Sequence, residues 1–226
     1  MNLASNRLQV EAKFKMPNPM EDGGVIKVEL DATMKSPEGK TWQVDPIFPE
    51  VFEAPASAWG IDEGFAQMLV GMVAALQPQL VLETGTNRGR STRAIAEGLA
   101  FAGNEGSKVV TVDRTDHKIL ESGAIYEEIA KYVTPVIGHT PKVFAEDPLD
   151  SIQGFDFAFL DGDHSPDGIL IELDYLETHR AEQCTVVIDN TIDSGWPELK
   201  KFFEGYADYP CVNFPTMSGT TIIQMR

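Results

Sequence analysis

The sequence predicts an α/β fold: a doubly wound, mostly parallel sheet with an antiparallel hairpin at its C-terminal edge. From Asp62 onward, apolar runs short enough for buried strands alternate five times with segments of helical periodicity. Two of these runs, Phe155–Leu160 and 185–188, stop abruptly at polar residues. Because ligands of open parallel sheets bind at the carboxyl ends of strands, these two ends indicate a functional site.

The first predicted helix begins after Asp62, whose carboxylate suits an N-cap. Its apolar residues recur at helical spacing from Phe65 onward, and Pro78 ends it. Residues 80–82 form the first core strand, and a helix over 91–102 follows a glycine-containing turn.

The alternation continues to the C-terminus. Ser165 suits the N-cap of a further helix, with Pro166 at its first position and Asp167 near its positive end. The other predicted elements are strands over 108–112, 134–137, 155–160 and 185–188, helices over about 118–132 and 197–203, and a closing hairpin of 211–214 and 220–225.

Residues 1–55 are predicted to form a β-rich N-terminal extension, followed by the main domain over 56–226. Apolar and polar residues roughly alternate over 7–14 and 25–30, as they do in half-buried strands. The extension could cover the active site, pack on the core, or pair with another subunit in a homo-oligomer.

Composition limits the classes of function. The chain has 35 Asp and Glu against 18 Lys and Arg, a net charge of −17 that disfavours nucleic-acid binding. Two cysteines are too few for a disulfide framework. We see no secretory signal and no apolar stretch long enough to span a bilayer, so we expect a cytoplasmic protein without a membrane partner.

The turn after the first core strand suits a ligand. Its sequence is Glu83-Thr-Gly85-Thr-Asn-Arg-Gly89-Arg-Ser91. Glycines there permit positive φ and a close backbone approach, and the next helix start offers free N–H groups to an anion. The turn lacks the third glycine of the dinucleotide fingerprint and the lysine of the triphosphate loop.

The charges near this turn favour one cofactor. Asp113, at the end of the next strand, can accept hydrogen bonds from ribose hydroxyls. Glu83 suits an ammonium group better than a pyrophosphate, so S-adenosylmethionine fits better than NAD. The predicted cofactor-binding residues in this region are Glu83, Gly85, Thr86, Asn87, Gly89, Ser91 and Asp113.

Asp161, Asp189 and Asn190 follow two core strands and offer the oxygen ligands that Mg²⁺ prefers. They would leave positions for a chelating substrate. Two simpler interpretations remain open: the segment from Asp161 to His164 could be only a turn that ends a strand, and Asp189 and Asn190 could form an Asx turn.

From about Asp62 to the C-terminus, the chain resembles the class I S-adenosylmethionine-dependent methyltransferases, which have a Rossmann-like fold. More narrowly, it resembles the divalent-metal-dependent O-methyltransferases of the catechol, caffeoyl-CoA and bacterial macrolide-sugar types. Glu83-x-Gly85-x-x-x-Gly89-x-Ser91 is similar to their first motif. The resemblance implies that Glu83 and Ser91 hold the methionine end of the cofactor, and that Asp113 holds the ribose.

The same resemblance implies further roles. His139, within residues 138–140, would contact the adenine. Asp161, Asp189 and Asn190 would bind the metal. His164, three residues after Asp161, would be the general base, a role that suits a group titrating near neutrality.

The sequence therefore predicts a Mg²⁺-dependent O-methyltransferase acting on a small-molecule acceptor with adjacent hydroxyls, such as a sugar or polyphenol. Asp161 and His164 would be its catalytic residues. Two alternatives remain: a non-catalytic or accessory protein that retains the fold, and an NAD-dependent dehydrogenase, which the missing third glycine disfavours.

Overall fold

The computed structural model describes residues 60–139, 143–144, 149, 151–192, 195–206, 208–214, 216 and 218–226, together with three N-terminal strands. Contacts divide the chain into two compact units, Met1–Pro55 and Ala56–Arg226. In the first unit, β1 (Gln9–Lys15), β2 (Glu29–Lys35) and β3 (Thr41–Val44) form an antiparallel sheet in that order. Most of the strand predicted over 25–30 lies outside the described residues.

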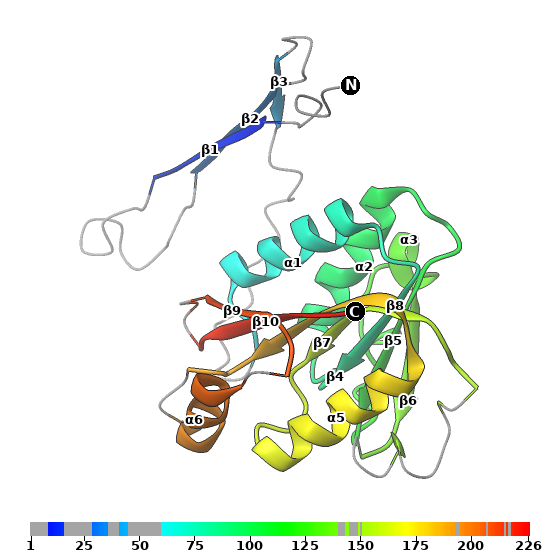
Figure 1. Ribbon diagram of the computed structural model, residues 1–226. Coiled ribbons are helices and arrows are strands. Elements are labelled where there is room, and N and C mark those ends of the chain that lie inside the picture. Colours follow the sequence, from blue (N-terminus) through cyan, green and yellow to red (C-terminus); the bar gives the residue numbers. More distant parts are fainter. Residues whose placement is uncertain are drawn as a thin grey trace. The chain divides into compact units, whose positions relative to one another are not determined.

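The second unit contains a seven-stranded sheet with the order β6-β5-β4-β7-β8-β10-β9 (Figure 1). Its strands are β4 (Leu80–Thr84), β5 (Lys108–Asp113), β6 (Val133–Ile137), β7 (Phe155–Leu160), β8 (Arg180–Asp189), β9 (Cys211–Phe214) and β10 (Thr220–Met225). The strands from β6 to β8 pair in parallel, whereas β10 runs antiparallel to both of its neighbours. The predicted mostly parallel sheet with a C-terminal hairpin is confirmed.

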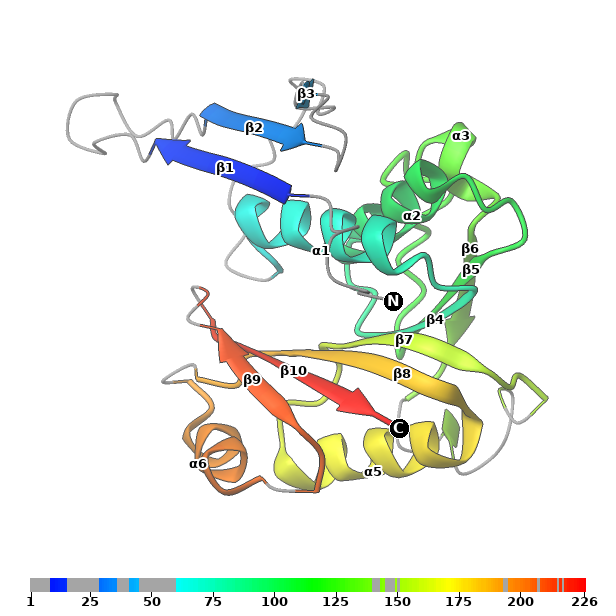
Figure 2. The same ribbon diagram turned by 45° about the horizontal axis from the view of Figure 1, so that its top comes forward.

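Helices cover both faces of this sheet (Figure 2). One face carries α1 (Glu63–Leu76), α2 (Arg90–Ala102) and the short α3 (Glu127–Ala130), and the other carries α5 (Pro166–His179) and α6 (Pro197–Gly205). The buried apolar residues accordingly form two clusters, one on each side of the sheet. None of the helices among the described residues has the length and apolar character needed to cross a membrane.

Local hydrogen bonds fix the predicted helix starts. The Asp62 carboxylate accepts a hydrogen bond of 2.9 Å from Phe65 N, and the Ser165 hydroxyl accepts one of 3.0 Å from Gly168 N. Both side chains therefore act as N-caps, satisfying donors that have no partner inside the helix.

The helix predicted over about 118–132 is wrong for most of its length, because only Glu127–Ala130 is helical. Lys118 has a φ of +52° and Gly123 a φ of +80°. A right-handed helix cannot continue through such left-handed residues, so the segment folds as turns instead.

Candidate active site

The glycine turn after β4 lies directly against the carboxyl end of β7. Gly85 has a φ of +84°, and a Cβ atom there would lie only 2.3 Å from the backbone oxygen of Asp161. The Gly85 N–H donates to the Val112 carbonyl at 2.9 Å, which ties the turn to β5 as well. Only glycine fits this position, and its absence of a side chain brings the predicted cofactor turn beside the predicted metal ligands.

Gly89 is the N-cap of α2, with a φ of +81°. A Cβ atom there would approach the Ile119 side chain to 3.1 Å. This second left-handed glycine lets the chain enter α2 closely packed against the loop after β5, so both predicted glycines have a backbone role.

Glu83 is a fully buried acid at the end of β4. Its Oε2 accepts a hydrogen bond of 2.6 Å from the Thr92 hydroxyl, while its Oε1 has no hydrogen-bond donor among the described residues. Burial raises the pKa of Glu83 to about 7, although the nearby hydroxyls of Ser91, Thr111 and Thr92 favour the charged form. The buried carboxylate could therefore be satisfied by a cationic donor.

Asp113, at the end of β5, is held by backbone donors from two loops. Its Oδ2 accepts from Asn87 N at 2.8 Å, and its Oδ1 accepts from Thr115 N, also at 2.8 Å. His117 Nε2 lies 3.6 Å from the same Oδ1. The structure thus joins the glycine turn to the predicted ribose-binding acid through Asn87.

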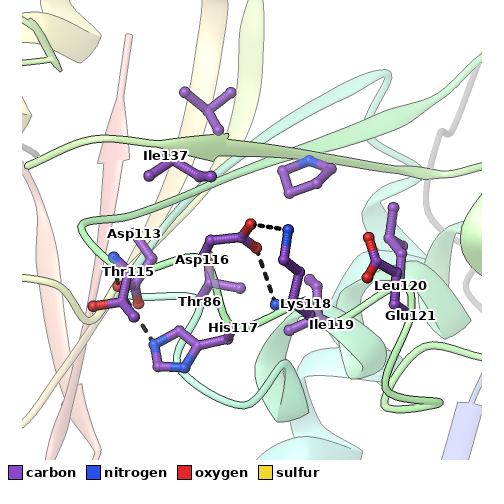
Figure 3. A pocket seen from close by; sticks show the side chains of 12 residues that line it. Thr86, Asp113, Thr115, Asp116, His117, Lys118, Ile119, Leu120, Glu121 and Ile137 are labelled. Carbon is purple, nitrogen blue, oxygen red and sulfur yellow. Dashed lines mark hydrogen bonds and ion pairs between the residues drawn. The ribbon is translucent and has the colours of Figure 1, made fainter.

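A pocket of about 200 Å³ opens beside Asp113 (Figure 3). It is lined by Thr86, Asp113, Thr115, Asp116, His117, Lys118, Ile119, Leu120, Glu121, Pro135, Val136 and Ile137. The hydroxyl of Thr86, one of the lining residues, lies 2.5 Å from the hydroxyl of the buried Thr111. His139 is exposed and does not line this pocket, whereas Ile137 does. The lining combines carboxylates, which can accept hydrogen bonds from ligand hydroxyls, with apolar side chains, which can pack against a flat ring of a ligand.

Asp161 directly follows β7, and Asp189 is the last residue of the neighbouring strand β8, at the same edge of the sheet. Leu160 pairs with Ile188 in the parallel β7–β8 ladder. Asp161, the residue after Leu160, therefore lies beside the end of β8, where Asp189 stands. Asn190 follows with a φ of +61°, a conformation that asparagine tolerates. Within the described residues, no three His, Cys, Asp or Glu side chains are arranged to hold a metal ion. The predicted site therefore depends on Asn190 as its third ligand.

Buried negative charge surrounds Asp161. Burial raises its pKa well above the usual value, and the nearby carboxylates of Asp189, Glu83 and Glu172 raise it further. Glu172 is completely buried on α5, although the sequence interpretation did not select it. The signal was available, because helical spacing places this acid on the same apolar face as Ile169.

His164 stands beside Asp161 just before α5. Its Nε2 lies 3.8 Å from Asp161 Oδ1, and its ring centroid lies 4.7 Å from that of Trp196, at an interplanar angle of 41°. Asp163 accepts a hydrogen bond of 2.9 Å from Ser165 N, which agrees with its interpretation as a turn residue. The imidazole is therefore held between an acid and a partly exposed aromatic ring.

Comparison with known proteins gives the class of this domain. Residues 82–191 match the family model described as a methyltransferase domain. None of the curated protein sequences compared with the chain matches it.

Several solved structures share the fold. An O-methyltransferase from Bacillus cereus, in complex with SAH, has a TM-score of 0.61 and 18% identity, over 75% of this chain and 84% of that chain. The O-methyltransferase TomG from Streptomyces achromogenes is involved in tomaymycin synthesis, and its structure is in complex with SAM. It has a TM-score of 0.58 and 20% identity, over 72% of this chain and 80% of that chain. A methyltransferase from Geobacter sulfurreducens has a TM-score of 0.56 and 17% identity, over 73% of this chain and 79% of that chain.

The sheet order and the glycine turn define an α/β domain of the methyltransferase type. The match over residues 82–191 shows that this segment is similar to a methyltransferase domain. The predicted resemblance to class I S-adenosylmethionine-dependent methyltransferases is therefore confirmed.

Proposed function

We propose that this protein is an S-adenosylmethionine-dependent O-methyltransferase that uses Mg²⁺ or another divalent cation. Its acceptor is a small molecule with adjacent hydroxyls, such as a sugar or a polyphenol. The observation that carries the proposal is the close approach of Gly85 to the Asp161 backbone. A Cβ atom added to Gly85 would lie only 2.3 Å from the backbone oxygen of Asp161. A methyl donor lodged in the turn would lie next to the acids and His164. The Bacillus and Streptomyces O-methyltransferases with bound SAH or SAM share this fold and support the proposal.

The residues present fit the methyl donor. The Oε1 atom of Glu83, which has no donor among the described residues, suits an ammonium group. The carboxylate of Asp113 is fixed by two backbone N–H groups and suits ribose hydroxyls. S-adenosylmethionine, when bound, would supply an electrophilic methyl group on its sulfonium.

The residues present also fit a divalent cation. Asp161 and Asp189 are close, largely buried acids, and Asp161 has its pKa raised by burial and by neighbouring carboxylates. Such a concentration of negative charge favours a cation that neutralises it. Asp161, Asp189 and Asn190 would hold this ion, which would orient adjacent hydroxyl oxygens and make them more acidic.

His164 is the proposed general base. Its imidazole would accept the proton of the acceptor hydroxyl, and S-adenosylmethionine, held by Glu83 and Asp113, would supply the methyl group to the deprotonated oxygen. Asp161, with Oδ1 at 3.8 Å, stabilises the imidazolium that results. Holding acceptor and donor in line could contribute up to about 7–11 kcal/mol to lowering the barrier.

Calorimetry with S-adenosylhomocysteine and with NAD, each with and without Mg²⁺, tests the cofactor assignment. We expect S-adenosylhomocysteine to bind and NAD not to bind; binding of NAD alone would overturn the proposal. A panel of sugars and polyphenols, assayed for transfer of labelled methyl groups, then tests the acceptor class. If the protein binds S-adenosylhomocysteine but methylates monohydroxy compounds as well as it methylates diols, the proposed requirement for adjacent hydroxyls is contradicted.

Replacing the base gives the first specific prediction. We expect His164→Gln to lower turnover by about 10²–10⁴-fold, because the hydroxyl proton has no acceptor, while affinity for S-adenosylhomocysteine stays unchanged. His164→Lys is the matched variant: lysine is also a base, so partial activity should return with a pH profile shifted to higher pH. Full turnover of His164→Gln at neutral pH would remove His164 from the mechanism.

A further inference from the structure

The turn between β9 and β10 contacts the acidic end of β8. Ser218, in this turn, donates a hydrogen bond of 2.6 Å from its hydroxyl to Oδ1 of Asp189. The two residues are 29 positions apart in the chain, and Asp189 is only 5% exposed. A short hydrogen bond to a buried carboxylate restricts the rotation of that group.

The backbone around Ser218 is fixed independently of this hydroxyl. Thr191 N donates to the Gly219 carbonyl at 3.1 Å. Gly219 has a φ of +79°, and a Cβ atom there would lie 2.5 Å from Ile192 N and 1.8 Å from Ile192 Cγ1. The close approach of two backbones, possible only with glycine, therefore presents the Ser218 hydroxyl to Asp189.

The next strand residue reinforces this placement. Thr220 pairs with Asp189 in the antiparallel β8–β10 ladder. The hairpin thus pairs with the end of β8 in a defined register. The paired residue, Thr220, lies two positions after Ser218, whose hydroxyl contacts Asp189. Ligand carboxylates in metal sites commonly need such an outer hydrogen bond to keep their orientation, and losing it typically weakens metal binding about 10–100-fold.

We infer that Ser218 is a positioning residue of the proposed cation site: it orients Asp189 and does not itself contact the acceptor or the methyl donor. This inference rests on the proposed function, because it requires Asp189 to bind a divalent cation. The sequence interpretation built this site only from residues at the ends of the strands over 155–160 and 185–188. The inference adds the C-terminal hairpin to the site.

The experiment compares three variants by calorimetry with Mn²⁺ and with Mg²⁺, on full-length protein saturated with S-adenosylhomocysteine. Ser218→Ala removes the hydroxyl, and Ser218→Thr keeps it. Thr216→Ala is the control, because the Thr216 hydroxyl lies in the same turn but contacts the Thr220 hydroxyl, at 2.8 Å, rather than an acid.

We expect Ser218→Ala to weaken cation affinity at least about 10-fold, with affinity for S-adenosylhomocysteine unchanged. Ser218→Thr and Thr216→Ala should bind the cation as the wild type does. Unchanged cation affinity in Ser218→Ala, or an equal loss in Thr216→Ala, overturns the inference and leaves the proposed function standing. A wild-type protein that binds S-adenosylhomocysteine but no divalent cation instead overturns the cation requirement, and the role of Ser218 with it.

Discussion

Glu83 shows how a single buried charge can prepare a binding site. The residue is completely buried, and among the described residues only its Oε2 atom has a hydrogen-bond donor, the Thr92 hydroxyl. Retaining an acid there costs stability in the unliganded protein, which a cationic ligand would offset.

The second prediction follows from the pKa of Glu83, which is raised from 4.5 to about 7. Between these values the folded protein keeps a proton that the unfolded chain has released. The free energy of unfolding should therefore fall as the pH rises from about 4.5 to about 7, by on the order of 3 kcal/mol from this group. Urea unfolding across this range should show a smaller fall in Glu83→Gln.

Asp161 contributes a pH dependence of the same sign in both proteins, and Glu83 itself adds to the raised pKa of Asp161, so the difference between the two proteins measures Glu83 together with its effect on Asp161. Saturating S-adenosylhomocysteine should also reduce the slope of the wild type, because an ammonium group near Glu83 would lower its pKa. Equal slopes in the wild type and Glu83→Gln would show that the carboxylate is not perturbed by burial.

Gly85 gives the third prediction. Gly85→Ala should destabilise the protein by about 2–5 kcal/mol, combining left-handed strain with overlap against the Asp161 backbone, and should weaken binding of S-adenosylhomocysteine. Gly103→Ala is the matched control: it has a similar φ of +73° but nothing within 4 Å of the added Cβ atom. The control should cost only about 1–2 kcal/mol and leave ligand affinity unchanged. Equal losses in the two variants contradict the close approach.

At the scale of secondary-structure elements, α1 and α2 pack closely through a glycine. A Cβ atom on Gly98 of α2 would lie 2.7 Å from Val73 Cβ and 3.0 Å from the Val70 carbonyl oxygen of α1. This contact determines how near α2 lies to α1. Since α2 begins at the glycine turn, its packing also helps to place that turn.

The fourth prediction compares two helical glycines. Gly98→Ala should destabilise the protein by about 1–3 kcal/mol through overpacking, despite the higher helix propensity of alanine. Gly71→Ala, on an exposed position of α1 with nothing within 4 Å, should instead stabilise it by about 0.5–1 kcal/mol. Chemical denaturation measures both changes, and a gain in stability for Gly98→Ala would refute the tight helix contact.

At the scale of the whole molecule, the second unit contains its own two apolar clusters. One lies between the sheet and α1 to α3, and the other between the sheet and α5 and α6. Both are built from described residues after position 60. A domain with a continuous core on each side of its sheet can fold alone.

The fifth prediction is that residues 56–226, expressed without the N-terminal unit, unfold cooperatively. Their midpoint temperature should lie within a few degrees of that of the full chain, because each unit has its own internal contacts. Affinity for S-adenosylhomocysteine should also be retained. A folded fragment that has lost this affinity would show that residues 1–55 contribute to the cofactor site.

Much of the fold could be predicted from local chemistry. Asp62 and Ser165 were recognisable as N-caps because each interaction spans only three residues. The end of β7 was equally visible, because an apolar run stops at Asp161. The incorrect helix after β5 had a different cause: helical periodicity gave no sign that Lys118 is left-handed and that Ile119 packs beneath Gly89.

The sequence by itself determined the strand and helix order, the glycine turn and the acids that end β7 and β8, since each of these depends on neighbouring residues. Only the tertiary structure decided which distant groups meet there. It placed the Asp161 backbone against Gly85, buried Glu172 near the same acids, and brought Ser218 to Asp189. These contacts depend on strand order and on the packing of separate elements, which local patterns of residues do not encode.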